Sequence, residues 1–100
     1  MKRVLVQYRV KKEKAEENKA YIKKVFMQLQ EDSPEGIRYA SFVQPDGVSF
    51  VHIASVETPD GKNPLSELPA FKAFQKEIKD RCEVPPTAVE LIEVGTYRLF

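Results

Sequence analysis

The sequence has one cysteine, one histidine and no tryptophan among its 100 residues. The single cysteine, Cys82, cannot form an internal disulfide, and this favours a reducing compartment. Transition-metal sites are built mainly from histidine and cysteine, and the carboxylates of this chain show no recognisable metal-ligand spacing. Glycines are also too few, and wrongly spaced, for a phosphate-binding loop around Gly61. We therefore predict no metal site and no bound cofactor.

Neither sign of charge is in excess, since 16 lysines and arginines face 15 aspartates and glutamates. Nucleic acids and anionic membranes usually select a basic excess, so we predict neither as a partner. No apolar run approaches the roughly 20 residues of a membrane span. The first residues carry a strand pattern, unlike the apolar segment of a signal peptide. These features predict one cytoplasmic domain, because a chain of this length suits a single hydrophobic core.

The most strongly patterned stretch is a predicted β-hairpin. Two runs rich in β-branched and aromatic residues, 37–44 and 48–57, flank the turn residues 45–47, which read Pro-Asp-Gly. This combination is typical of a hairpin. Both arms carry apolar side chains on both faces: Phe50 projects one way and Val51 the other, by the two-residue period of a strand. Helices packed as a single layer cover only one of these faces.

The remaining elements follow from changes of period. Alternation predicts a first strand and a last strand, the latter interrupted by a bulge at Gly95. Apolar residues at spacings of three and four predict two amphipathic helices, the second capped by Ser66 and ended by Pro85 and Pro86. The predicted strands lie near 3–10, 37–44, 48–57 and 88–98, and the predicted helices near 13–31 and 66–82.

The resulting βαββαβ order predicts an α+β, ferredoxin-like fold. In that fold a four-stranded antiparallel sheet carries both helices on one face. The other face of the sheet would be bare and apolar, and such a surface on a single chain is an association surface. Burying two such faces against each other in a twofold homodimer is the simplest closed solution.

Particular stretches of the chain also resemble a known family. Residues 50–57, 63–65 and 68–74 are similar to the antibiotic biosynthesis monooxygenase-like branch of the dimeric α+β barrel superfamily. The resemblance implies a homodimer whose two sheets form a barrel, with a ligand cavity between sheet and helices in each subunit. Some relatives oxidise aromatic polyketides or quinols with dioxygen and no metal or flavin, others degrade haem, and some have no known substrate. The haem-degrading and polyketide-oxidising relatives employ a tryptophan, which this chain lacks.

Two residues are candidates for catalysis. His52 is the only histidine, lies in a predicted strand, and has a free pKa near neutrality that suits a general base. The alternative is a structural histidine that simply finds a hydrogen-bond partner. Tyr39 offers a phenol to a ligand oxygen, or else packs with its hydroxyl in water.

Three further residues are candidates for ligand binding. Tyr8 lies in the first predicted strand, and Phe71 and Phe74 lie in the second predicted helix. Their side chains would line an aromatic cavity on the sheet side of that helix. At this spacing phenylalanines are more often ordinary core residues.

Two functions remain open from the sequence. One is a cofactor-independent monooxygenase that acts on an aromatic or quinol-type small molecule. The other is a non-catalytic small-ligand binder or structural dimer. A polar pocket that joins His52 to a tyrosine would favour the first, and a cavity filled by phenylalanine side chains would favour the second. Whether the protein is an enzyme is left undecided at this point.

Overall fold

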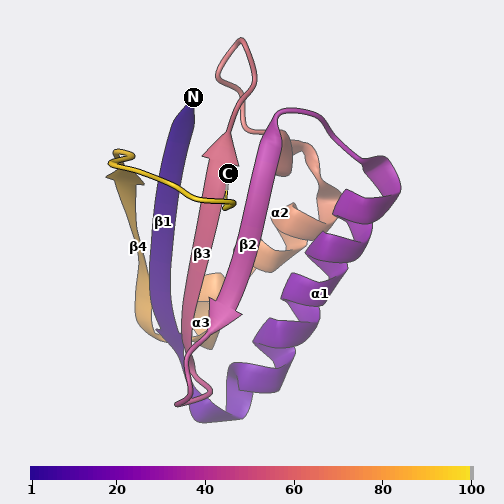
Figure 1. Cartoon of the computed structure of the whole chain (residues 1–100). Helices are drawn as coiled ribbons and strands as arrows, with labels where there is room; N and C mark the ends of the chain where they lie inside the picture. The colour runs from indigo at the N-terminus through magenta and orange to yellow at the C-terminus, as the bar shows by residue number, and fades with distance from the viewer. Residues whose placement is uncertain (100) are drawn as a thin grey trace.

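The computed structural model describes residues 1–99. In this range strands and helices follow one another in the predicted order, with short helical segments added before each main helix and after the second (Figure 1). The bounds are β1 Lys2–Val10, η1 Lys12–Lys14, α1 Ala15–Asp32, β2 Ile37–Val43, β3 Ser49–Val56, η2 Pro64–Glu67, α2 Pro69–Lys76, α3 Ile78–Arg81 and β4 Cys82–Leu91.

The four strands form one antiparallel sheet in the order β2-β3-β1-β4. The β2–β3 hairpin is closed by Asp46, whose carboxylate accepts hydrogen bonds from the backbone N–H groups of Val48 and Ser49. Gly47 has a φ of +77°, a left-handed conformation that glycine adopts without steric cost. The predicted antiparallel hairpin is therefore confirmed, with its turn specified by local residues.

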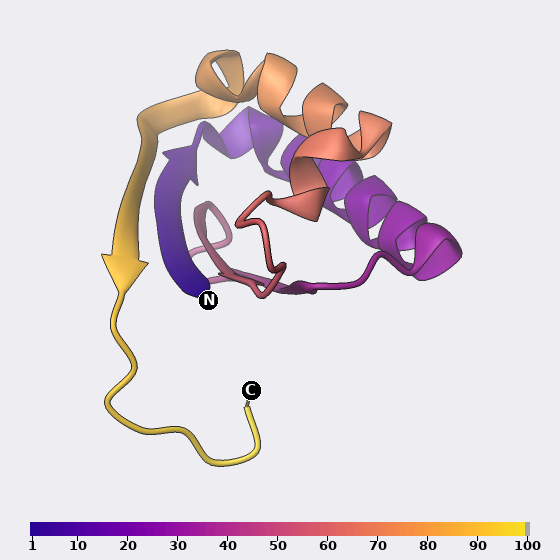
Figure 2. The same cartoon turned by 90° about the horizontal axis from the view of Figure 1, so that it is seen from above.

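All the helices cover the same face of the sheet (Figure 2). The core between the layers contains Tyr8 and Val10 of β1, Phe50 of β3, Val25 of α1 and Phe74 of α2, each at most 7% exposed. Alternate residues of β1, β2 and β3 reach this core, as the two-residue period requires, whereas the edge strand β4 contributes only Cys82 among the described residues. The predicted α+β ferredoxin-like fold, a four-stranded antiparallel sheet with helices on one face, is confirmed.

The opposite face of the sheet, here called the free face, carries an apolar row across all four strands. Ile53 at the centre of β3 pairs with Ala40 of β2 and with Leu5 of β1, and Leu5 pairs in turn with Val89 of β4. Phe42 extends the apolar surface on β2 and is 55% exposed. Leu5, Ala40 and Ile53 are half-buried and Val89 is 53% exposed, while the helices lie on the other face, so the free face is partly open to solvent.

The last strand lies elsewhere than predicted. It was expected over 88–98, with Pro85 and Pro86 outside it, but β4 includes both prolines. The strand is at the edge of the sheet, and its register with β1 shifts between Gln7 and Val10. Proline is tolerated at edges and irregular pairings because no ladder hydrogen bond is lost there. The prediction treated the two prolines as helix breakers and missed this.

The second helix is also divided. It was predicted as one helix over 66–82 with Ser66 as its N-cap, but η2, α2 and α3 share this stretch. Leu68 is extended, because proline disfavours helical backbone in the residue before it, and α2 begins at Pro69. The side chain of Asn63 caps η2 by accepting a backbone N–H.

The segment after β4 does not continue the sheet. The prediction of a bulge at Gly95 and of a strand beyond it was wrong, since residues 92–99 form no strand and are all exposed. The segment extends on the side of the free face (Figure 2), and Glu93 forms an ion pair with Arg3 near its start. It displays Tyr97 and Leu99, which are 81% and 68% exposed. The last residue, which was expected to join them, lies outside the described residues.

Candidate functional site

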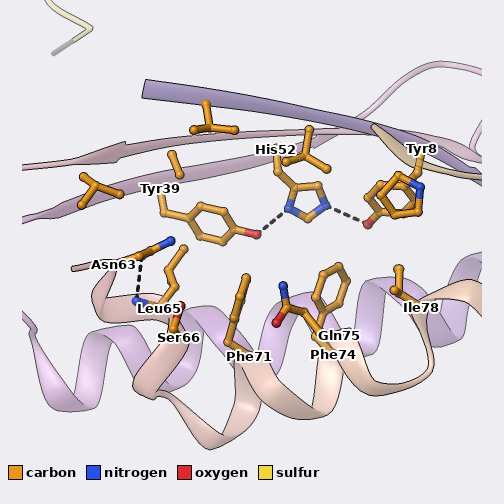
Figure 3. Close-up of a pocket in the computed structure, with 15 residues that line it drawn as sticks. Tyr8, Tyr39, His52, Asn63, Leu65, Ser66, Phe71, Phe74, Gln75 and Ile78 are labelled. Carbon is orange, nitrogen blue, oxygen red and sulfur yellow. Dashed lines mark hydrogen bonds between the residues drawn. The ribbon is translucent and has the colours of Figure 1, made fainter. Parts of the chain in front are cut away.

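A cavity of about 250 Å³ lies between the helix-covered face of the sheet and α2 (Figure 3). Aliphatic and aromatic side chains form most of its wall, and an imidazole between two phenols forms its polar side. The cavity is lined by Val4, Val6, Tyr8, Tyr39, His52, Ala54, Val56, Asn63, Leu65, Ser66, Phe71, Phe74, Gln75, Ile78 and Pro86.

His52 is the centre of the polar side. It lies on β3 opposite Ser41 of β2, on the helix-covered face, and is only 4% exposed. Its Nδ1 atom is 2.5 Å from the Tyr39 hydroxyl and 2.7 Å from the Ser41 hydroxyl. Its Nε2 atom is 2.7 Å from the hydroxyl of Tyr8 on β1 (Figure 3). Three neighbouring strands therefore supply one hydrogen-bonded cluster, and both imidazole nitrogens have partners.

The cluster continues through two helices. Asn18 of α1 donates from its side-chain amide to the Tyr8 hydroxyl at 2.9 Å. Arg81, at the end of α3, donates from Nε to the amide oxygen of Asn18 at 3.1 Å and from Nη2 to the carbonyl of Phe74 at 2.7 Å. Asn18 is 0% exposed and Arg81 is 2% exposed. A buried chain of hydrogen bonds thus runs from Arg81 to the cavity.

Arg81 brings a buried positive charge to this chain. Its guanidinium carbon lies 4.4 Å from the ring centre of Tyr21 and 5.3 Å from that of Phe74, which places it between two aromatic faces. No carboxylate forms an ion pair with it among residues 1–99. Its Nη1 atom is buried without a hydrogen-bond partner. Because an unbalanced charge acts over several ångströms in a low-dielectric interior, Arg81 favours negative charge in its vicinity.

Burial also sets the protonation of the cluster. It lowers the pKa of His52 from 6.5 to about 4, so the imidazole is neutral at neutral pH. Burial raises the pKa of the Tyr8 hydroxyl, and the hydrogen bond from Asn18 opposes this only in part. It raises the pKa of Tyr39 as well, against the opposing effect of a hydrogen bond with Ser41. Both phenols therefore keep their protons at neutral pH.

The lowered pKa of His52 predicts a pH-dependent stability. Between pH 6.5 and about 4 the unfolded chain binds a proton at this position while the folded chain does not, so stability falls as pH falls through this window. A pKa lowered from 6.5 to about 4 corresponds to a loss of about 3 kcal/mol in the free energy of unfolding at the acid end of this window. Urea unfolding at pH 7 and at pH 4 measures this difference in the free energy of unfolding.

The matched comparison is His52→Gln, which keeps hydrogen-bonding atoms but cannot titrate. Carboxylates contribute equally to both proteins, so the difference between their pH profiles isolates His52. We expect the variant to lose less stability between pH 7 and 4 than the wild type. Parallel profiles would show that the buried imidazole titrates normally.

All five candidate residues line the same cavity. His52, Tyr39 and Tyr8 form its polar side, and Phe71 and Phe74 form part of its aromatic wall. Phe71 and Phe74 lie with ring centres 6.0 Å apart. Their placement brings the expected residues together, while their roles in catalysis and ligand binding stay predictions.

Sequence reasoning missed three members of the cluster: Asn18, Ser41 and Arg81. A signal was present for two of them. Asn18 falls three residues after Ala15 on the apolar stripe of α1, and Arg81 falls three residues after Ile78 on the stripe that leads to it. A polar residue on an apolar stripe is buried by the helix geometry and must find partners there. Ser41 has no comparable signal, because serine is common on strand surfaces.

Neither a group of metal-binding side chains nor a membrane-spanning helix is found in the described range. No group of three or more histidine, cysteine and carboxylate side chains within residues 1–99 is placed to hold a metal ion. Among the same residues, no helix combines the length and apolar character needed to cross a bilayer.

Comparison with known proteins identifies the fold. No family model matches the sequence, and none of the curated proteins is significantly similar to it in sequence. Among solved structures, an antibiotic biosynthesis monooxygenase superposes with a TM-score of 0.76 at 16% identity, over 95% of this chain and 100% of the other. A cofactor-independent oxygenase from Streptomyces nogalater superposes with a TM-score of 0.70 at 13% identity, over 97% and 96% of the two chains.

A protein from Mycobacterium tuberculosis gives a TM-score of 0.77 at 11% identity, over 95% of this chain and 96% of the other. The class that these comparisons define is the ferredoxin-like α+β fold of the antibiotic biosynthesis monooxygenase-like proteins. The resemblance inferred from the sequence is thus confirmed as a likeness of fold. At these identities the likeness does not extend to a reaction or a substrate.

Proposed function

We propose that this protein is a cofactor-independent monooxygenase that acts on an electron-rich aromatic or quinol-type molecule. The observation that carries the proposal is the cavity in which His52 and Tyr39 meet an aromatic wall. A polar pocket joining the histidine to a tyrosine is the feature that distinguishes this function from a plain packed core. The fold shared with a cofactor-independent oxygenase supports the same assignment.

The cavity suits a small aromatic ligand. Its volume of about 250 Å³ is just below the range typical of drug-sized ligand sites, which points to one or two fused rings. Such a ring would pack against Phe71 and Phe74, and its oxygen substituent would face Tyr39. The positive charge of Arg81 behind the polar side favours the anionic form of that substituent.

The reaction needs no electron source beyond the substrate. A phenol that binds as its phenolate, after releasing its proton to solvent, is an electron-rich anion, which reduces dioxygen and forms a carbon–oxygen bond at a ring CH. The released proton is taken up again when water leaves. Loss of water from the resulting hydroperoxide leaves a quinone: one oxygen atom enters the ring, the other leaves as water, and the four electrons come from the substrate. The protein contributes a dry cavity and groups that stabilise the anion.

We further propose that the working form is a homodimer. The apolar row through Ile53 and Leu5 lies on the face that the helices leave free, and the segment 92–99, which carries exposed apolar residues, extends on the same side (Figure 2). Two free faces packed by a twofold axis would bury both rows and form a barrel. The terminal segment would then lie against the partner, with Tyr97 and Leu99 as its apolar contacts.

Dioxygen consumption tests the proposed function. Purified protein, treated with a chelator, is incubated with small phenols and quinols in an oxygen electrode, and products are analysed after reaction under ¹⁸O₂. We expect one dioxygen consumed and one labelled oxygen incorporated per substrate converted. Uptake that disappears after chelation would contradict a cofactor-independent mechanism.

The alternative is a non-catalytic small-ligand binder or structural dimer. It is favoured by the satisfied hydrogen bonds of His52 and by the lowered pKa of its imidazole, which makes it a weak base. The same assay separates the two. Saturable binding of an aromatic ligand without dioxygen uptake, across the panel of phenols and quinols, would favour the binder.

A further inference from the structure

The donor-to-acceptor direction of the buried hydrogen-bond chain is fixed at one end by Arg81. A guanidinium group only donates hydrogen bonds and cannot accept them. The Arg81 Nε–H donates to the side chain of Asn18, so the atom of Asn18 that faces Arg81 is the amide oxygen. The amide NH₂ group of Asn18 consequently faces Tyr8 and donates to its hydroxyl oxygen at 2.9 Å.

The direction passes through Tyr8 to the imidazole. The Tyr8 oxygen accepts from Asn18, and its own proton must go to an acceptor. Among residues 1–99 the partner left for that proton is Nε2 of His52, at 2.7 Å. With the opposite arrangement Tyr8 would accept twice and its buried O–H would have no acceptor, which is unfavourable. The Nε2 atom is therefore the unprotonated nitrogen.

The direction then reaches the cavity. A neutral imidazole carries one proton, which is left on Nδ1 and points to the hydroxyls of Tyr39 at 2.5 Å and Ser41 at 2.7 Å. The Ser41 hydroxyl can donate to the Tyr39 oxygen or, at 3.3 Å, to Nε2 of His52, and the Tyr39 hydroxyl can donate to Ser41 or outward. Tyr39 lines the cavity and Ser41 does not. The Tyr39 O–H is thus the donor of this network that remains free for a ligand, and it is directed into the cavity.

We propose that Arg81 and Asn18 are positioning residues that set the tautomer of His52 and make Tyr39 a hydrogen-bond donor to the ligand. The site accordingly selects an aromatic molecule that presents an accepting oxygen, a ketone carbonyl or a phenolate. The second half of this inference, that Tyr39 donates to an accepting oxygen of the ligand, is called the ligand half; it deepens the proposed function and rests on it. The direction of the network stands on the structure alone.

The direction is tested by nitrogen NMR of the imidazole, which is unambiguous because His52 is the only histidine. In the wild type at pH 7 we expect a protonated Nδ1 and a bare Nε2. Asn18→Asp keeps the shape of the side chain but replaces the donor to Tyr8 with an acceptor, and it gives Arg81 a carboxylate partner. Tyr8 then donates to Asp, accepts from His52, and the proton moves to Nε2.

A protonated Nε2 in the wild type, or the same tautomer in wild type and Asn18→Asp, would overturn the inference. Should Asn18→Asp fail to fold, Tyr8→Phe provides the second test. It removes the donor to Nε2, so the Nδ1–H tautomer should lose population, and an unchanged tautomer would count against us. Tyr21→Phe removes a hydroxyl outside the hydrogen-bond chain and should leave the tautomer unchanged.

The ligand half is tested with a matched pair of probes. α-Tetralone has one accepting carbonyl on an aromatic bicycle, and tetralin is the same skeleton without it. We expect the wild type to bind α-tetralone at least tenfold more tightly than tetralin, and Tyr39→Phe to remove that preference. Equal binding of the two probes would overturn the ligand half, whatever the tautomer. Turnover of a phenol with the tautomer reversed would leave the proposed function standing and refute this inference.

Discussion

Sedimentation equilibrium at micromolar concentration should give about twice the chain mass of 11.5 kDa, and Ile53→Asp should lower the result to a single chain. Ile53 lies at the centre of the free face, paired on one side with Ala40 and on the other with Leu5. A twofold axis through this face would place the new carboxylate in the interface twice. Each would be buried without a partner.

The expected effect is large on physical grounds. Specific interfaces bury at least roughly 1,000 Å² in total, and a full sheet face on each subunit reaches this size. The gross hydrophobic gain, at about 25 cal/mol per Å², is tens of kcal/mol before the costs of association. An uncompensated buried charge costs about 3–5 kcal/mol, and every 1.4 kcal/mol changes the dissociation constant about tenfold. Two such charges should weaken the dimer by several orders of magnitude.

Met27→Asp is the matched control. It introduces the same charge at an apolar residue that is 61% exposed on α1, away from the sheet, and should leave the mass doubled. Circular dichroism shows whether Ile53→Asp remains folded, since subunit folding and association are coupled when an interface forms much of the core. A folded wild-type monomer at micromolar concentration would refute the dimer.

The second large effect concerns turnover. His52→Ala should abolish dioxygen consumption while the dimer stays intact, because the imidazole holds the two phenols at the cavity and lies on the helix-covered face, away from the proposed interface. Loss of one positioned hydrogen-bond donor that stabilises a developing anion costs about 10²–10³-fold in turnover. Tyr39→Phe should cause a loss of similar order, since its hydroxyl is the group proposed to donate to the ligand.

The controls separate chemistry from packing. His52→Gln refills part of the volume left by His52→Ala, so a loss of turnover common to both is not a consequence of an empty cavity. Tyr21→Phe removes a phenol hydroxyl outside the cavity and should turn over normally. Full activity of His52→Ala on a substrate of the wild type would show that the imidazole is a structural residue.

The elements that the sequence predicted best are those with a strong local signal. The hairpin around Asp46 and Gly47 has turn residues that act within a few positions of themselves, and both flanking strands lie where expected. The predicted element boundaries were wrong where a strand distant in the sequence determines them. Pro85 and Pro86 join β4 because that strand is at an edge beside β1, and no local pattern states which strand is at an edge.

The candidate site divides in the same way. The sequence by itself determined the types of residue available for chemistry: a single histidine in a strand, strand tyrosines, and phenylalanines at helical spacing. It also determined the two-sided apolar sheet, because alternation in each strand is a local property. The five candidates were therefore within reach of sequence reasoning.

Only the tertiary structure decided which of these residues meet. Contacts between Asn18, Tyr8, His52 and Arg81 join four elements whose separation along the chain is as much as 63 residues. Their register depends on the strand order and on the angle at which α1 and α3 cross the sheet, which packing of the whole core sets. A hydrogen bond requires an alignment of a few tenths of an ångström, and periodicity fixes only which face a residue occupies. The direction of the network, and the donor it presents to the cavity, could be derived only once that alignment was in place.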